Sequence, residues 1–525
     1  MTKYLINRIL RALLSVILVV AVIMVMVYAF LDRESIFASD PNYPKMLLNK
    51  KQIYMMQQWE KFGYLDYVNY TDYLAQELKA GNITQEERDS AAIIGATEEK
   101  DSEIASKLIN EFTEKYRAMG YDVKRLPGQV KIGTVKYKDG GAPYVYAYRD
   151  IPLTNRLWTY FTKLIRIDNI HNVENIQGER GMTFTWYDPA YGGEKFSPAI
   201  MGNGTTHKYL LYCDDSFPYI HQNLVDINLG LSFSINNGID VFSTMTDAQG
   251  PQKKTLITYP TGVVEETADD LHSLVYVPDS LANGGELMNR YYVDDYTGVT
   301  TAKSGMSQMG YSFVIGIISV ILAYLMAVPL GITMALNKDK TIDKLGTLYI
   351  IFIMAVPSLG YIFIFRAIGS LMKLPTTFNV QTPTWLMYIL PVISLSLPSI
   401  VNLMKWLRRY RIDQMNADDV KVARSGGLSE GQIFRKHVLK NAIIPIVHGI
   451  PGSVLGALTG AIITERVYMV PGIGNVLTEA INKYDNGVIV GVALFYALLS
   501  VTSFILGDVL MSMMDPRISF TSKQR

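Results

Sequence analysis

Residues that could carry out a reaction are sparse in this sequence and form no recognisable catalytic set. Residues 298–304 come nearest to a phosphate-binding G-x-x-x-x-G-K-[ST] loop, but Ala302 stands where the second glycine must lie. The acidic pairs at 214–215 and 294–295 are adjacent, so their side chains point apart on a strand. Six scattered histidines show no metal-ligand spacing, and the single cysteine, Cys213, excludes an intrachain disulfide. The sequence therefore predicts no active site, metal or cofactor on this chain.

Apolar residues are concentrated in blocks that are long enough to cross a bilayer, for which a helix needs about 20 residues. The blocks are residues 12–31, 310–336, 345–365, 385–404, 443–464 and 488–507. The first block follows Lys3, Arg8 and Arg11 and so resembles a signal peptide, but it is longer than the usual apolar region of one. No clear cleavage site follows it. We therefore expect an uncleaved first helix and six membrane spans.

Charge is distributed unevenly along the chain. Residues 32–305 hold 27 Lys and Arg against 37 Asp and Glu, a net charge of −10, whereas the remainder holds 22 against 11, a net charge of +11. Short loops rich in Lys and Arg stay in the cytoplasm. With six spans, both termini and the loops near 340 and 405–440 fall on one side. We expect a multi-pass protein of the cell membrane with both termini cytoplasmic and residues 32–305 extracellular.

Polar side chains inside the predicted spans are costly to bury in lipid and are often functional. The candidates for a translocation path are Asn402, His448, Thr459, Thr464 and Glu465. Hydrogen bonding between helices is the alternative explanation for each of them. The fifth span also carries a stripe of small residues, Gly452, Gly456 and Gly460, which suits close packing.

The external segment has the length and composition of a folded domain. Residues 54–80 and 101–119 carry apolar residues at helical spacing, whereas residues 130–137 and 144–148 alternate as strands do. Residues 157–166 are amphipathic and basic, so we expect them near the membrane surface. These patterns predict that the external segment folds as an α+β domain.

The loop between the fourth and fifth spans, residues 405–442, is far longer than a turn requires. It predicts two short amphipathic helices separated at Gly426-Gly427. Ser429 and Gln432 have the spacing of a capping box at the start of the second helix. Another protein can bind such a protrusion.

This loop resembles the EAA loop of ABC importer permeases. In the peptide branch of that family the loop has the sequence A-R-A-K-G-L-S-E followed by H-x-L-x-N-A-x-x-P. The chain reads A-R-S-G-G-L-S-E at 423–430 and H-V-L-K-N-A-I-I-P at 437–445. Ser425 and Gly426 depart from the customary alanine and lysine, which puts the details of the ATPase contact in question. His437 and Leu439 favour the peptide, dipeptide and nickel branch over the sugar importers.

Other segments extend this resemblance across the membrane portion. Tyr4 begins a match to Y-x-x-x-R-[LI]-L, Glu465 a match to E-x-V-[FY]-x-x-P-G-[LI]-G, and Asp508 a match to D-x-x-x-x-x-x-D-P-R. The large external insertion resembles the enlarged Ami-type oligopeptide permeases of Gram-positive bacteria.

The resemblance implies a six-helix bundle with the type I ABC importer permease fold and an α+β extracellular domain inserted between helices 1 and 2. It divides the chain into residues 1–31, the extracellular domain 32–305, and a five-helix core 306–525 with the coupling loop at 405–442. It implies peptide import driven by partner subunits that bind ATP and Mg. The residues that it assigns to ATPase coupling are Ala423, Arg424, Gly427, Leu428, Ser429, Glu430, His437 and Leu439.

The implied partners are a second permease in a heterodimer, two cytoplasmic ATP-binding subunits, an extracellular peptide-binding lipoprotein, the peptide substrate and membrane lipid; no nucleic acid is expected. A membrane-anchored receptor remains an alternative, although it would need one span and no loop. A permease for dipeptides or nickel-type ligands is another. A secondary transporter would require charged mid-membrane residues and inverted repeats, which are not evident in the sequence.

Overall fold

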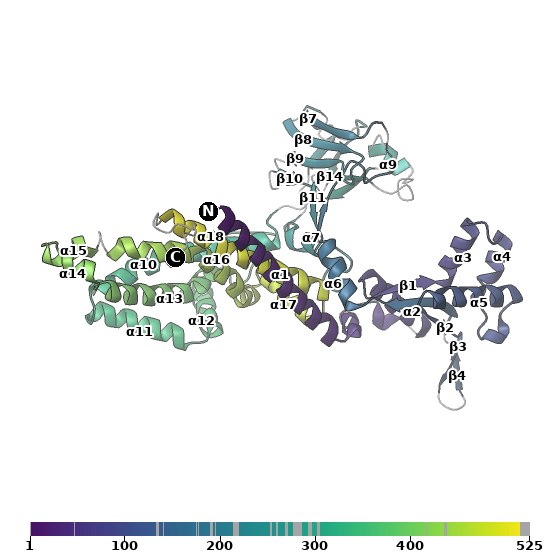
Figure 1. The fold of residues 1–525 in the computed structure, drawn as a ribbon, viewed down its shortest axis with the longest axis horizontal. Coiled ribbons are helices and arrows are strands. Elements are labelled where there is room, and N and C mark those ends of the chain that lie inside the picture. The colour runs from purple at the N-terminus through teal and green to yellow at the C-terminus, as the bar shows by residue number, and fades with distance from the viewer. Residues whose placement is uncertain are drawn as a thin grey trace.

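The membrane helices of the computed structural model form one end of the molecule, and the insertion between the first two extends from the other end (Figure 1). The structure describes residues 2–46, 48–132, 136–139, 141–174, 176, 178–188, 193–194, 196–213, 220–251, 255–258, 261–267, 271–276, 286–291, 297–301, 305–415, 417–434 and 438–514.

Five helices in the described part of the chain are long and apolar enough to cross a membrane. They are α1 (Thr2–Phe30), α10 (Gln308–Leu336), α13 (Ile389–Met415), α16 (Leu439–Tyr468) and α18 (Asn486–Met514). The helices α11 (Thr341–Ala355) and α12 (Ser358–Leu371) have the length and composition of a span only when they are taken together, and the pair bends by 107°. The bend falls at Val356-Pro357, because proline disfavours the helical conformation in the residue before it. Each predicted span thus coincides with a helix or with this bent pair.

Two apolar cores hold the bundle together. The larger core joins α10, α11, α12, α13 and α16 around buried side chains such as Ile315, Val401 and Ala461. Glycines let these helices approach closely: a Cβ at Gly331 of α10 would lie 3.0 Å from Leu407 of α13. The second core joins α1, α18 and the short helix α17 (Ile473–Asn482).

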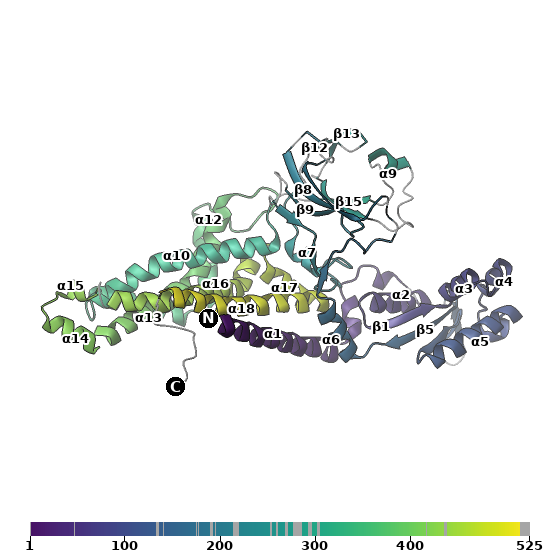
Figure 2. The same ribbon diagram turned by 45° about the horizontal axis from the view of Figure 1, so that its top comes forward.

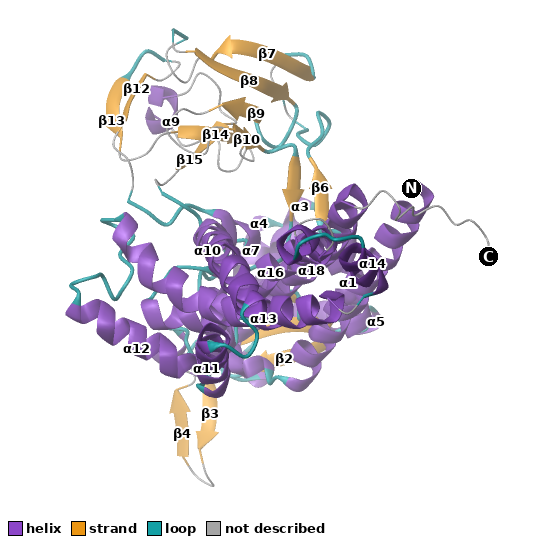
Figure 3. Ribbon diagram, turned by 90° about the vertical axis from the view of Figure 1, so that its left-hand side faces the viewer, coloured by secondary structure: helices purple, strands orange, loops and turns teal. Residues whose placement is uncertain are grey.

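The first part of the insertion is a small α+β unit. Its sheet has the antiparallel order β1-β5-β2 (Leu65–Asn69, Tyr144–Asp150, Asp122–Leu126), with Leu65 opposite Asp150. Its helices are α2 (Leu48–Lys61), α3 (Tyr70–Lys79), α4 (Gln85–Ala91) and α5 (Glu103–Ala118). A hairpin of β3 (Gln129–Ile132) and β4 (Lys136–Asp139) projects from it (Figure 3). The helix predicted over 54–80 is confirmed in α2 and α3, but β1 interrupts it to pair with β5.

The second part of the insertion is built mainly from strands. A four-stranded antiparallel sheet has the order β10-β9-β8-β7 (Ile220–Gln222, Tyr209–Cys213, Phe196–Asn203, Gly181–Tyr187). Three two-stranded ribbons accompany it: β6 (Ile165–Ile167) with β11 (Val225–Ile227), β12 (Thr255–Thr258) with β13 (Val264–Thr267), and β14 (Leu271–Tyr276) with β15 (Thr297–Thr301). Its described residues also form the helices α6 (Leu153–Thr162), α7 (Val241–Thr246) and α9 (Glu286–Tyr291). The α+β class predicted from the sequence is confirmed.

The insertion is fastened to the outer end of the bundle by a buried carboxylate. Asp485, between α17 and α18, is fully buried. Its oxygens accept the N–H groups of residues 233, 234 and 235 at 2.8–3.0 Å and the Ser232 hydroxyl at 2.7 Å. We call this set of contacts the Asp485 clamp. Apolar packing reinforces it, because Leu229, Val241 and Met245 of the insertion belong to the core formed by α1, α17 and α18.

Candidate functional site

The loop between α13 and α16 carries two short helices at the tip of the molecule, at the opposite end from α3, α4 and α5 (Figures 1 and 2). These helices are α14 (Asp418–Ser425) and α15 (Glu430–Ile433). We call residues 418–434 the coupling knob. Its place at the tip leaves it accessible to another protein.

The two helices of the coupling knob are separated by a Schellman turn. Gly427 has a φ of +82°, a left-handed conformation that glycine adopts without steric cost. The Leu428 N–H donates to the Ala423 carbonyl at 3.2 Å, and the Gly427 N–H donates to the Arg424 carbonyl at 3.0 Å. Gly426 has an ordinary φ of −77°, and a Cβ there would make only ordinary contacts at 3.5 Å. The turn therefore requires glycine at 427 but not at 426.

A small apolar core and a capping box hold the second helix in place. Val420, Ala423, Ile433 and Val438 are buried together, and Leu428 packs against them. Ser429 and Gln432 exchange hydrogen bonds, from the Ser429 N–H to Gln432 Oε1 at 3.0 Å and from the Gln432 N–H to Ser429 Oγ at 3.4 Å. The predicted break at 426–427 and the predicted cap are both present. The knob is thus a folded unit rather than an extended loop.

The residues predicted for ATPase coupling divide into an inner and an outer group. Ala423 is buried and Leu428 half-buried, so both support the fold of the knob, whereas Arg424, Gly427 and Ser429 are exposed. Glu430 begins α15 and Leu439 begins α16; their side chains are not among those described, and His437 lies outside the described residues.

One exposed residue of the knob was missed by the reasoning from sequence. Val422 of α14 is 71% exposed, although it is apolar and lies beside the buried Ala423. An apolar residue on the outer face of a short, otherwise charged helix is the signal that would have identified it, because covering such a side chain with a partner protein is favourable. Val422 therefore joins Arg424 and Gly427 on the surface that a partner can touch.

A buried ion pair braces the stem of the knob. Arg408, near the end of α13, donates two hydrogen bonds to Asp343 of α11, at 2.6 Å and 2.8 Å. The Asp343 side chain is 3% exposed, and the Asp339 N–H also donates to it at 3.0 Å. Two parallel bonds between a guanidinium and a carboxylate fix orientation as well as distance. The brace joins α13, which leads into the knob, to the bent pair of helices.

Glu465, predicted for the translocation path, lies at a junction inside the membrane bundle. It is 1% exposed, and its carboxylate accepts the Ser312 hydroxyl at 2.6 Å and the Asn475 N–H at 3.2 Å. The carboxylate thereby caps the beginning of α17, where a negative charge is favourable. A side chain at Gly472 would overlap the Glu465 carboxylate. This packing explains why the glutamate and glycine of the sequence motif occur together.

The other four path candidates lie in different surroundings. Thr464 is buried, and His448 is half-buried with its ring against Gly507 of α18. Asn402 and Thr459 are exposed on α13 and α16. The small residues Gly452 and Gly456 have no atom within 4 Å of where a Cβ would stand, and at Gly460 only Leu395 approaches, to 3.8 Å. The exposed face of α16 is therefore open along three helical turns.

Known proteins resemble this chain over its whole length or over its membrane portion. The family model of binding-protein-dependent transport system inner membrane components matches residues 327–520. The oligopeptide transport system permease protein AmiC of Streptococcus pneumoniae serotype 4 is 33% identical over 529 residues, which cover all of this chain and 99% of AmiC.

Shorter relatives match only part of this chain. The dipeptide transport system permease protein DppB of Bacillus subtilis is 26% identical over 217 residues, which cover 40% of this chain and 68% of DppB. The DppB protein of Lactococcus lactis is 27% identical over 229 residues, or 42% of this chain and 73% of that protein. The MetNI methionine ABC transporter covers 39% of this chain with a TM-score of 0.31 and 11% identity.

The full-length match includes the insertion as well as the helices. Permeases of ABC importers are not catalytic and bind no cofactor, and they act with ATPase and binding-protein partners. The coupling knob, the membrane spans and the full-length match to AmiC agree, and the chain belongs to the permease family of binding-protein-dependent ABC importers.

Proposed function

We propose that this chain forms, with a second permease in a heterodimer, the membrane passage of an ATP-driven oligopeptide importer. The full-length similarity to the oligopeptide permease AmiC supports this cargo over the dipeptides handled by relatives that match two fifths of the chain. The folded coupling knob is the observation that carries the proposal. A receptor with one span would have no use for it.

The proposed orientation places both termini and the coupling knob in the cytoplasm and residues 32–305 outside. The excess of basic residues outside 32–305 supports it. An ion pair between Arg8 of α1 and Asp508 of α18 joins the beginning of the first span to the end of the last one. Both residues then lie at the inner membrane boundary, where charged side chains reach water. The proposed domain boundaries remain 1–31, 32–305 and 306–525.

In the proposed mechanism, two cytoplasmic ATP-binding subunits grip the knobs of the two permeases. A partner shifts a conformational equilibrium only if it contacts the two states differently. Val422, Arg424, Gly427 and Ser429 offer the contact surface, while Ala423 and Leu428 keep it in shape. Glu430, His437 and Leu439 keep their proposed roles in coupling. Because Arg408 is bonded to Asp343, movement of the knob is transmitted through α13 to α11.

The passage is proposed to run along the open face of α16. Thr459 and Asn402 present polar groups there, and the glycines leave room for a peptide or for a helix of the second permease. Thr464, His448 and Glu465 lie behind this face and are proposed to support the path. Outside the membrane, the insertion is proposed to receive an extracellular peptide-binding lipoprotein.

The test compares two neighbouring glycines in the intact transporter. Gly427→Val forces a branched side chain into a φ of +82°, whereas Gly426→Val sits in an ordinary conformation. We expect Gly427→Val to reduce uptake of a labelled oligopeptide at least tenfold at equal membrane abundance, and Gly426→Val to reduce it less than threefold. Normal uptake by Gly427→Val would refute the coupling role. Uptake of a dipeptide but not of an oligopeptide would refute the cargo.

A further inference from the structure

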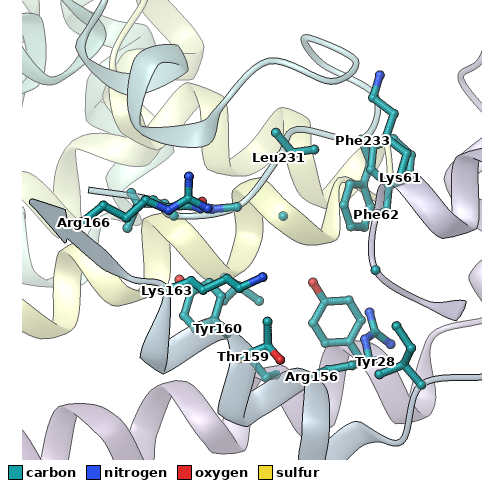
Figure 4. Close-up of a pocket in the computed structure, with 18 residues that line it drawn as sticks. Tyr28, Lys61, Phe62, Arg156, Thr159, Tyr160, Lys163, Arg166, Leu231 and Phe233 are labelled. Atoms are coloured by element: carbon teal, nitrogen blue, oxygen red, sulfur yellow. The ribbon is translucent and has the colours of Figure 1, made fainter. Parts of the chain in front are cut away.

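A cavity of about 320 Å³ lies where the extracellular insertion meets the outer ends of α1 and α18 (Figure 4). Met24 and Tyr28 of α1 and Val490 of α18 line its membrane side. Helix α6 and residues 228–233 line the other side. The cavity is thus shared by two membrane helices and the domain that rests on them.

The lining of this cavity is strongly basic. It includes Lys61, Arg156, Lys163 and Arg166 and contains no Asp or Glu. In the part of the chain that the structure describes, none of these four cations forms an ion pair. Asp226 faces Arg166 across the β6–β11 ribbon without reaching ion-pair distance. The carboxylates of Asp240 and Asp485 act on the nearby Tyr160 and Tyr28 but pair with none of the four cations, so the cavity keeps an excess of positive charge that favours an anion.

The individual side chains are arranged as a binding site would be. The Lys163 ammonium extends into the space between Tyr160 and Tyr28 (Figure 4). The buried Tyr160 hydroxyl has no hydrogen-bond partner. The Arg156 guanidinium lies 3.9 Å from the Tyr28 ring centroid and 4.0 Å from that of Tyr64, so its direction is fixed by stacking. The Tyr160 hydroxyl is closed off from solvent, so an anion in the cavity would be bound by the charges and N–H donors of the basic side chains.

The position of the cavity relative to the bilayer follows from helix geometry. Tyr28 is 20 residues beyond Arg8 along α1, which is about 30 Å at 1.5 Å per residue. That length equals the hydrocarbon thickness of a bilayer, so Tyr28 lies at one membrane boundary when Arg8 lies at the other. On α18, Gly487 and Asp508 are separated by 21 residues and give the same result. The cavity therefore opens at the level of the lipid headgroups.

Apolar side chains beside the cations point outward at the same level. Trp158 of α6 is 73% exposed, and Ile165 and Ile167 of β6 are 63% and 68% exposed. A tryptophan beside basic residues is typical of segments that rest on a membrane surface. On α1, Met26 is 58% exposed next to the cavity-lining residues of that helix. An apolar surface thus continues from the cavity toward the bilayer.

We propose that this cavity binds the phosphate headgroup of an anionic phospholipid from the leaflet on the side of the insertion. Lys163 and Arg166 neutralise the phosphate, and the acyl chains lie along α1. The lipid contacts α1, α18, α6 and residues 228–233 at once, so it stabilises the seating of the insertion on the bundle. This site is separate from the peptide passage along α16.

The test measures lipid retention by the purified full transporter, with native mass spectrometry after detergent exchange and titration with short-chain phosphatidylglycerol or phosphatidylcholine. Each basic residue near a membrane surface contributes about a factor of five to anionic lipid binding, so Lys163→Gln with Arg166→Gln is expected to weaken binding of phosphatidylglycerol by roughly 25-fold. Binding of phosphatidylcholine is expected to stay unchanged. A matched variant, Lys79→Gln with Arg117→Gln, removes two exposed charges from α3 and α5 at the far end of the insertion. It should leave the binding of phosphatidylglycerol and of phosphatidylcholine unchanged.

Three outcomes would overturn the proposal. The first is unchanged phosphatidylglycerol binding in Lys163→Gln with Arg166→Gln. The second is an equal loss of phosphatidylglycerol binding in the matched variant, which would indicate a general effect of charge. The third is binding of glycerol 1-phosphate as tightly as the lipid, which would identify a soluble phosphate as the ligand. Lipid retention needs no transport, so its failure is distinguishable from a failure of peptide uptake.

Discussion

Replacing Asp485 by alanine tests how the insertion is held on the membrane bundle. The carboxylate accepts three backbone N–H groups from residues 233–235, and its removal leaves them without an acceptor. A hydrogen bond to a charged group contributes about 1.5–3 kcal/mol. Because water can reach the half-buried Ser234 and Ile235, we take about 3–4 kcal/mol for the three bonds together rather than their full sum. Local opening of this segment should become roughly 10²–10³ times more frequent.

Amide hydrogen exchange of the intact transporter measures this opening directly, because exchange follows local unfolding. We expect amides 233–235 to lose two to three orders of magnitude of protection in Asp485→Ala. Amides of α7 should keep theirs, because the buried side chains of Val241 and Met245 contribute about 1.5–3 kcal/mol each and are untouched. The change is therefore confined to the clamp.

The matched control is Asp168→Ala in the insertion. Asp168 accepts the N–H groups of Thr206 and His207, both at 2.8 Å, so its loss is chemically similar but lies away from the membrane helices. Asp168→Ala should speed hydrogen exchange of amides 206–207 and leave amides 233–235 protected. If amides 233–235 exchange within threefold of their normal rate in Asp485→Ala, the clamp contributes little and the reasoning is refuted.

Two further predictions concern the ends of the molecule. Val422→Asp places a charge on the exposed outer face of the knob, so less ATPase should co-purify, by about tenfold. The control is Ile342→Asp, which places the same charge at an exposed apolar position of α11 outside the knob, and an equal loss in both would argue against a specific contact. In the insertion, burial alone would raise the pKa of Asp101, but hydrogen bonds from Arg125 and the Gly95 N–H lower it below its ordinary value. The ionised Asp101 carboxylate therefore stabilises the folded state fully above the ordinary pKa of about 3.9. This stabilisation is lost as the pH falls through the lower pKa that Asp101 has in the folded state. Protection of amides 95–101 should decline in that acidic range, and a constant protection there would contradict the prediction.

The parts of the fold that were predictable from the sequence depend on local chemistry. Span length, the break at Gly426-Gly427 and the cap formed by Ser429 and Gln432 are set by residues within a few positions of one another. The α+β class of the insertion was predictable for the same reason. The architecture of the insertion was not, because β1 pairs with β5 about 80 residues later and thereby interrupts an apparently helical segment.

The contacts of the buried carboxylates were likewise only partly predictable from the sequence. Asp485 stands before an apolar helix and is recognisable from sequence as a cap, but its partners near residue 233 are about 250 residues away. Glu465 was recognisable as an intramembrane acid, yet its cap on α17 depends on how the chain turns at Gly472. A polar residue inside a span is therefore evidence of a specific partner before it is evidence of a transport path.

Helix α16 connects these features in a single element. It begins directly after the coupling knob, runs for 30 residues or about 45 Å, and ends at Glu465 and Tyr468 beside the cap of α17. Helix α17 then leads to Asp485, which holds the insertion. A physical route from the knob to the insertion thus needs one long helix and one short one, but coupling also requires an element with two arrangements. Pro445 and Pro451 interrupt the hydrogen bonding of α16 in the half that adjoins the knob, so that half is where bending costs least. If the knob moves as proposed, we expect bending at these prolines and displacement of the remaining half of α16, which carries the open face proposed for the peptide.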